Sequence, residues 1–142
     1  MEEKTRIMLA KLALKARERA YVPYSGFSVG AALLTDAGEV VTGCNIENAS
    51  YPAGMCAERT AIFAAVASGK TGVRALAVAG GKQGSAPQDY CMSCGMCLQV
   101  ISEFCGPDFP IYVVVDESRI RQFTLRELLP YTFVLEKDDV TS

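Results

Sequence analysis

Residues 73–81 read VRALAVAGG, an apolar stretch interrupted only by Arg74 and the most informative one for the fold. A second run of the same kind, PIYVVVD, occupies residues 110–116. Continuous apolar strands are typical of parallel strands that are buried on both faces. The segment between them, CGMCLQVISEF at 94–104, has a helical pattern. Strands that alternate with helices in this way predict a mixed sheet covered by helices.

The segments on either side of this region extend the same architecture. A Gly-containing turn, DAGE, joins two predicted strands into a hairpin. Pro23 ends the first predicted helix and Gly69 closes the second. The predicted elements are a helix at 4–20, strands at 27–35 and 40–46, a helix at 56–69, a short strand at 119–124 and a helical turn at 125–130. We therefore expect one α/β domain over residues 1–142, in three α/β/α layers around a mixed five-stranded sheet.

Composition excludes several classes of partner. Half of the 142 residues are hydrophobic, which is enough for a core, and the net charge of −2 gives no broad basic surface for nucleic acid. The apolar runs are too short for a membrane span, and the acidic start MEEKTRIMLA is unlike a signal peptide. We expect a cytoplasmic protein with neither a nucleic-acid nor a membrane partner.

The sequence contains no histidine. This excludes nucleophilic mechanisms that depend on a Ser–His or Cys–His pair within the chain. A zinc site can then use only cysteine and carboxylate ligands. General acid–base catalysis must fall to Asp, Glu, Lys, Tyr or Cys.

Three of the six cysteines lie in YCMSCGMC, residues 90–97. In a chain without a signal peptide and with a good core, such clustering indicates metal or catalytic use rather than disulfides. Cys94 and Cys97 lie in the first turn of a predicted helix, whereas Cys91 lies in the loop before it. Spacing alone leaves Cys91 open as a stand-in ligand or a redox-sensitive neighbour, but we expect a spare loop residue.

A second predicted helix start carries Cys56, followed by Glu58 and Arg59. A thiolate at a helix N-terminus is stabilised by free backbone N–H groups. Cys56, Cys94 and Cys97 would make a tripod for Zn²⁺ that leaves the fourth tetrahedral position for water. Glu58 can reach that water as a base, and Arg59 could neutralise the negative charge of the thiolates. Taken alone, Glu58 would be an ordinary acid in the first turn of a helix.

Cys-Ala-Glu followed by Cys-x-x-Cys is the signature of zinc nucleoside and nucleobase deaminases, with cysteine where many members have histidine. The chain resembles the cytidine deaminase family of the short homotetrameric type. The resemblance extends through YVPYSGFSVGAALLT, GCNIENASYPAGMCAERTAI, CGMCLQVISEF and LRELLP. It implies hydrolytic deamination of cytidine, deoxycytidine or a modified cytidine to the uridine analogue plus ammonia, through attack of zinc-bound hydroxide at C4.

The resemblance also implies roles for individual residues. Cys56, Cys94 and Cys97 are the implied zinc ligands, and Glu58 is the implied proton shuttle. The implied substrate contacts are the Ala57 N–H group near the hydroxide, Asn45 and Glu47 on the ribose, Phe27 on the base, and Tyr51 and Phe133 in a neighbouring subunit's pocket. Without the motifs, Phe27 would be read as a core residue and Asn45 and Glu47 as turn residues.

Two positions depart from the family pattern, which has proline before the first cysteine of Cys-x-x-Cys and arginine after the second. Here Ser93 and Leu98 occupy these positions. The loss of the arginine suggests a more electron-rich zinc and a bound water with a higher pKa. Substrate preference is more open than reaction type, and a zinc deaminase of a non-standard aminopyrimidine is an alternative.

Two other classes of protein compete with a deaminase. The spacing of Cys91, Cys94 and Cys97 is similar to the start of a ferredoxin cluster run. A structural zinc module would use Cys91 as a fourth ligand. The first leaves Cys56 without a role, and the second leaves Glu58 without one.

Overall fold

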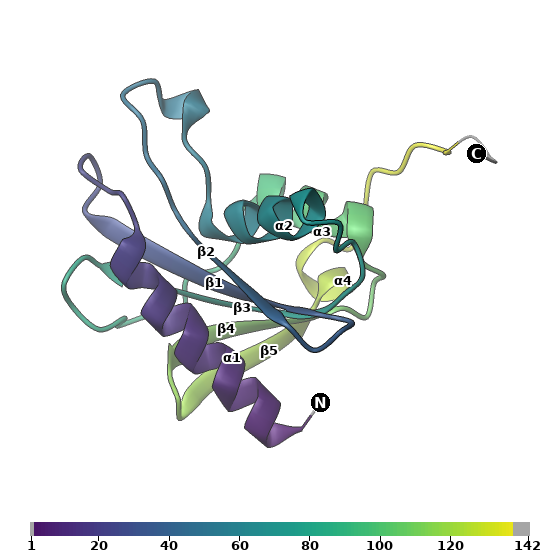
Figure 1. Cartoon of the computed structure of the whole chain (residues 1–142), viewed down its shortest axis with the longest axis horizontal. Helices are drawn as coiled ribbons and strands as arrows, with labels where there is room; N and C mark the ends of the chain where they lie inside the picture. The colour runs from purple at the N-terminus through teal and green to yellow at the C-terminus, as the bar shows by residue number, and fades with distance from the viewer. Residues whose placement is uncertain (1, 138–142) are drawn as a thin grey trace.

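The computed structural model describes residues 2–137, in which five strands form one sheet with helices on both faces (Figure 1). The elements are α1 (Glu3–Ala16), β1 (Phe27–Thr35), β2 (Val40–Cys44), α2 (Ala57–Ala67), β3 (Val73–Lys82), α3 (Gly95–Phe104), β4 (Pro110–Asp116), β5 (Arg119–Thr124) and α4 (Leu125–Leu128), with 3₁₀ turns at Arg17–Arg19 and Tyr51–Ala53. Each predicted element is present, and the differences lie at the element ends.

The strand order is β2-β1-β3-β4-β5. β3 and β4 pair in parallel, as their apolar sequences predicted, and the other neighbours pair antiparallel. The mixed five-stranded sheet is therefore confirmed. Because α3 connects β3 to β4, the loop that leaves β3 leads directly to the cysteines at the start of α3.

Two apolar clusters, one on each face of the sheet, hold the helices against it and so give three layers. α1 buries Leu9, Ala10 and Ala13 against Ala77, Ala79 and Tyr112 of the sheet. On the other face, α2 and α3 bury Ala61, Ile62 and Ile101 against Leu33, Leu76 and Val78. The predicted α/β/α arrangement is confirmed, and the cysteine-bearing helix starts lie on the same face of the sheet.

α2 lies very close to the strand beneath it. A Cβ atom built on Gly43 of β2 would lie 2.5 Å from the Ala57 carbonyl oxygen and 2.5 Å from the Ala61 nitrogen. A residue with a side chain would therefore push α2 away from the sheet. The glycine fixes the height at which the first turn of α2, with its reactive residues, is held.

The predicted helix at 4–20 ends its α-helical part at Ala16 and tightens into a 3₁₀ turn. In that turn, the buried Arg17 guanidinium donates to the carbonyl oxygens of Ser28 at 3.0 Å, Lys82 at 3.1 Å and Ser85 at 3.0 Å. The end of the first helix is thus tied to the loop that leaves β3.

The predicted strand at 40–46 also ends early, at Cys44. Beyond it, Asn45 N still donates to the Val29 carbonyl at 3.2 Å. The Asn45 side chain makes the other bonds to β1, because Oδ1 accepts from Val29 N at 2.9 Å and Nδ2 donates to the Phe27 carbonyl at 2.9 Å. A short-range sequence pattern does not reveal these side-chain bonds. Among the described residues, no helix is both long enough and apolar enough to cross a membrane.

Candidate active site

Three thiols from two helix starts converge at one point. The Sγ atoms of Cys56, Cys94 and Cys97 all lie within 4.8 Å of one another. Cys56 Sγ is 3.9 Å from Cys94 Sγ, which is 3.5 Å from Cys97 Sγ. Cys56 and Cys94 directly precede the first turns of α2 and α3, where backbone N–H groups lack intrahelical partners. The structure therefore brings together the three cysteines that the sequence suggested as a tripod.

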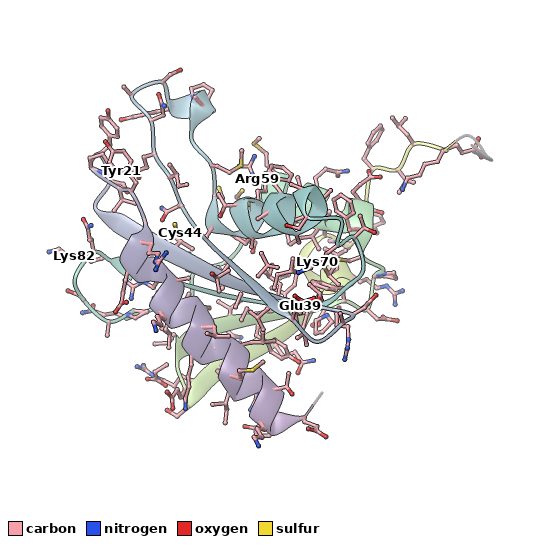
Figure 2. All side chains as sticks on the ribbon, in the orientation of Figure 1. Tyr21, Glu39, Cys44, Arg59, Lys70 and Lys82 are labelled. Atoms are coloured by element: carbon pink, nitrogen blue, oxygen red, sulfur yellow. The ribbon has the colours of Figure 1, made fainter. Side chains whose placement is uncertain are left out.

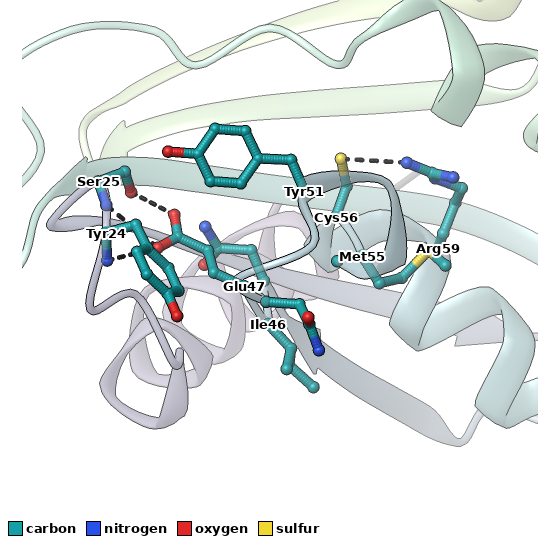
Figure 3. Close-up of a pocket in the computed structure, with 11 residues that line it drawn as sticks. Tyr24, Ser25, Ile46, Glu47, Tyr51, Met55, Cys56 and Arg59 are labelled. Atoms are coloured by element: carbon teal, nitrogen blue, oxygen red, sulfur yellow. Dashed lines mark hydrogen bonds between the residues drawn. The ribbon is translucent and has the colours of Figure 1, made fainter.

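Arg59 lies beside this group. Its guanidinium donates to Cys56 Sγ at 3.4 Å, a contact drawn in Figure 3. A hydrogen bond from Cys97 and the contact with Arg59 lower the pKa of Cys56 to about 5. The same contact with Cys56 raises the pKa of Cys97, because the shared proton stays on that sulfur.

Figure 2 shows Arg59 near one end of α2 and the ion pair of Lys70 and Glu39, at 2.8 Å, toward the other.

Glu58 follows Cys56 by two residues and is only 4% exposed. Burial raises the pKa of its carboxyl, and the neighbouring Ser93 side chain partly offsets this rise. The Ser93 hydroxyl and Arg59 Nε are buried and have no hydrogen-bond partner of ordinary geometry among residues 2–137. Buried polar atoms without a partner are uncommon, and they indicate a place where a ligand completes the bonding.

The donor set fits a zinc ion. Thiolates are preferred zinc ligands, and three of them leave one tetrahedral position open. A bound cation would favour ionisation of all three thiols, which otherwise share protons. Cys91 lies outside the group of three sulfur atoms, so the described residues do not assemble the fourth ligand of a four-cysteine module.

A cavity of about 430 Å³ opens beside Cys56 (Figure 3). This size falls in the range of small-molecule sites. The lining residues are Tyr24, Ser25, Asn45, Ile46, Glu47, Asn48, Tyr51, Gly54, Met55, Cys56 and Arg59. Five residues singled out from the sequence are therefore collected here: Asn45, Glu47, Tyr51, Cys56 and Arg59.

Glu47 is held in place by a turn that precedes β1. Its Oε1 atom accepts from the backbone nitrogens of Tyr24 at 3.0 Å and Ser25 at 3.1 Å, and its Oε2 atom accepts from the Ser25 hydroxyl. The hydrogen bond from the Ser25 side chain is the main cause that lowers the pKa of Glu47. The carboxylate is thus ionised and oriented at the cavity wall. Sequence reasoning did not identify Tyr24 and Ser25, since nothing in the local pattern links them to Glu47.

The remaining predicted substrate contacts are distributed differently. Ala57 is fully buried as the first residue of α2. Phe27 is 42% exposed and lines a separate cavity together with Cys91, not the one that Glu47 lines. Tyr51 lines the cavity of its own chain, with its ring edge-on to that of Tyr24 at 6.2 Å. Phe133 is 66% exposed, and its carbonyl accepts from Gln99 Nε2 at 3.2 Å. The structure does not bring Phe133 to the cavity of its own chain.

Leu98 packs in the apolar cluster beneath α2 and α3. The position that carries arginine in the family pattern is therefore occupied here by a core residue. Among residues 2–137, the cationic side chain that contacts the group of three thiols is therefore that of Arg59.

A three-thiol centre at two helix starts, with a buried glutamate two residues after one ligand, defines the class of zinc-dependent deaminases. The sequence profile of the cytidine and deoxycytidylate deaminase zinc-binding region matches residues 2–113. The chain belongs to the cytidine and deoxycytidylate deaminase family. The predicted family, enzyme class and zinc dependence are confirmed by this match.

Individual relatives agree over most of the chain. A cytidine deaminase from Halalkalibacterium halodurans is 47% identical over 131 residues, which cover 92% of this chain and 96% of the relative. A cytidine deaminase from Sporosarcina psychrophila is 46% identical over 127 residues, which cover 89% of this chain and 88% of the relative. The crystal structure of cytidine deaminase from Burkholderia pseudomallei superposes with a TM-score of 0.79 at 41% identity, covering 94% of this chain and 100% of that one.

Proposed function

We propose that this protein hydrolyses the 4-amino group of a free cytidine or deoxycytidine nucleoside, giving the uridine nucleoside and ammonia. The observation that carries the proposal is the buried Glu58 carboxyl beside three convergent thiols, next to a cavity with an oriented Glu47. Relatives that carry the name cytidine deaminase, with 46–47% identity, support the same reaction. A cavity for one small molecule in an acidic chain favours a free nucleoside over a nucleic acid.

Cys56, Cys94 and Cys97 would hold Zn²⁺. When bound, zinc supplies a Lewis acid that makes water nucleophilic near neutral pH. Arg59 donates to Cys56 at 3.4 Å and so offsets part of the negative charge of the thiolates. This matters because excess charge on the ligands weakens the Lewis acidity.

Glu58 would move the proton. Its buried carboxyl has a raised pKa, which suits a group that must both accept and give a proton near neutral pH. It takes a proton from the attacking water and gives it to N3 of the pyrimidine. It then takes the remaining proton from the new hydroxyl on C4 and gives it to the departing nitrogen. The C4–N bond breaks, the water oxygen becomes the new C4 carbonyl oxygen, and ammonia leaves.

The other residues would bind and orient the substrate. Glu47 and Asn45 line the cavity wall, where they would accept and donate hydrogen bonds to the sugar hydroxyls. Phe27 would pack on the base, and the unpaired N–H of Ala57 would donate toward the oxygen at C4. An absorbance screen of cytidine, deoxycytidine, N4-modified and ring-modified cytidines would identify the preferred substrate.

The test of the mechanism is Glu58→Gln, which keeps shape but cannot shuttle the proton. Ammonia release should fall by about 10²-fold to 10⁴-fold, whereas zinc content per chain stays that of the wild type. Glu103→Gln, an exposed glutamate on α3, is the control and should keep full activity. A Glu58→Gln variant with undiminished turnover would show that the proposed mechanism is wrong.

We also propose a homotetramer in which Tyr51 and Phe133 complete a neighbour's pocket. Both rings are largely exposed in the single chain, which is consistent with a partner subunit that covers them.

The cytoplasmic location stays a prediction.

A further inference from the structure

Cys91 has no part in the mechanism above, yet it shares a cavity with Phe27, the proposed contact of the base. It belongs to the loop between β3 and α3, three residues before Cys94. Gly80 of β3 leaves a gap on the sheet face that α2 and α3 cover, the face to which Leu76 and Val78 contribute. A Cβ atom built on Gly80 would lie 2.7 Å from Cys91 Sγ and 3.0 Å from Phe27 Cε2. The thiol and the ring edge therefore share the space over this glycine.

The backbone of Phe27 is fixed, whereas its ring depends on packing. The Ser25 hydroxyl accepts from the Phe27 nitrogen at 3.0 Å, and the Phe27 carbonyl accepts from Asn45 Nδ2 at 2.9 Å. No hydrogen bond can hold the phenyl ring, so its direction is set by the side chains beside it. Cys91 and Phe27 both line the cavity over Gly80, and both approach the same point above this glycine, so the thiol lies next to the ring.

The thiol acts here as a small apolar group. Burial, followed by the charges of Glu58 and Cys56, raises the pKa of Cys91 to about 11. It therefore stays protonated at neutral pH and packs like a short hydrophobic side chain.

We propose that Cys91 is a positioning residue for the pyrimidine base: its side chain fills the space over Gly80 and holds the Phe27 ring in the orientation that packs on the substrate. This inference rests on the proposed role of Phe27 in base binding. The required property is side-chain volume rather than thiol chemistry, since an empty space over Gly80 would let the ring rotate away from the base.

The test is a double-mutant cycle with Cys91→Ala, Phe27→Ala and the combined variant, measuring KM and kcat for cytidine and zinc per chain. Cys91→Ala should raise KM by at least about threefold, keep kcat within about twofold and retain zinc. In the Phe27→Ala background, Cys91→Ala should add nothing, because the ring that it positions is gone. Cys91→Thr, whose residue volume is close to that of cysteine, should keep a KM close to that of the wild type.

Cys105→Ala is the matched control, since Cys105 is another half-buried free thiol that packs against the α2 and α3 cluster. It should leave KM unchanged. If Phe27→Ala changes KM but Cys91→Ala does not, this inference is wrong and the proposed function still stands. The same holds if the change in KM of the combined variant equals the product of the two single changes. An unchanged KM in Phe27→Ala overturns the base-binding role and this inference together. Zinc loss in Cys91→Ala overturns it in favour of a ligand role.

Discussion

A carboxyl buried beside three thiols makes stability depend on pH at the scale of one residue. The pKa of Glu58 is raised in the folded protein, mainly by burial. Below the ordinary glutamate pKa the group is protonated in both the folded and the unfolded protein, so it costs nothing. As the pH rises from the ordinary glutamate pKa to the raised folded pKa, the folded protein keeps a proton that the unfolded chain has lost, and stability falls until the folded group is ionised too.

We therefore predict that Glu58→Gln stabilises the metal-free protein at neutral pH. The gain should appear as the pH rises above about 4.5 and level off above the raised pKa. Thermal unfolding from pH 4 to pH 8 in a chelator measures it, with roughly 3 °C expected for each 1 kcal/mol. Glu18→Gln, an exposed glutamate, should show no such trend. A melting temperature that falls at neutral pH in Glu58→Gln would contradict the prediction.

Single residues also mark where sequence reasoning reached its limit. Cys56, Cys94 and Cys97 could be selected because short motifs and helix starts carry their chemistry locally. The turn of Tyr24 and Ser25 that orients Glu47 joins segments about twenty residues apart, and no local pattern encodes it. Phe133 stays a prediction that depends on a second subunit.

At the scale of elements, the close contact between β2 and α2 carries the site. Gly43→Ala should destabilise the protein by about 1–3 kcal/mol, because the added methyl would collide with the backbone of α2. The displaced first turn should also bind zinc less well, because it carries Cys56. Urea denaturation and zinc titration measure the two effects.

Gly106→Ala is the control for this variant, since a Cβ atom at Gly106 has open space around it within 4 Å. It should keep both stability and zinc affinity. If Gly43→Ala also kept the stability and the zinc affinity of the wild type, α2 would be able to move away from β2 at no cost. The proposal that Gly43 fixes the position of the first turn of α2 would then be wrong.

Element types were predictable because hydrophobic periodicity and turn residues act locally. Element ends were less so. The first helix tightened at Arg17 and the second strand ended at Cys44, in both cases where a side chain bonds to distant backbone. Such long-range hydrogen bonds decide boundaries that periodicity leaves open.

At the scale of the whole molecule, the proposed tetramer can be tested by mixing subunits. Glu58→Gln chains lack the proton shuttle, and Phe133→Ala chains lack the aromatic ring. If Phe133 completes a neighbour's pocket, hybrids formed at equal ratio should regain about one quarter of wild-type activity, because a chain with Glu58 often meets a neighbour with Phe133. Light scattering should give four times the 15.2 kDa of one chain.

Hybrids whose activity equals only the average of the two variants would show that Phe133 acts within its own chain or not at all. Mixing wild-type chains with Phe133→Ala chains is the control for loss of protein during exchange.

The parallel pairing of β3 with β4 was predictable from their apolar sequences, whereas the full strand order depends on contacts across the whole sheet.

The convergence of Cys56 and Cys94 also closes a ring in the chain, because these sulfur atoms are 38 positions apart in sequence. A bound cation is therefore a reversible cross-link of the folded chain, which is lost and regained with metal supply. The free energy of unfolding should then rise with the logarithm of free zinc once zinc exceeds its dissociation constant. The lifetime of this enzyme in a cell becomes a readout of metal availability, separate from its rate of turnover.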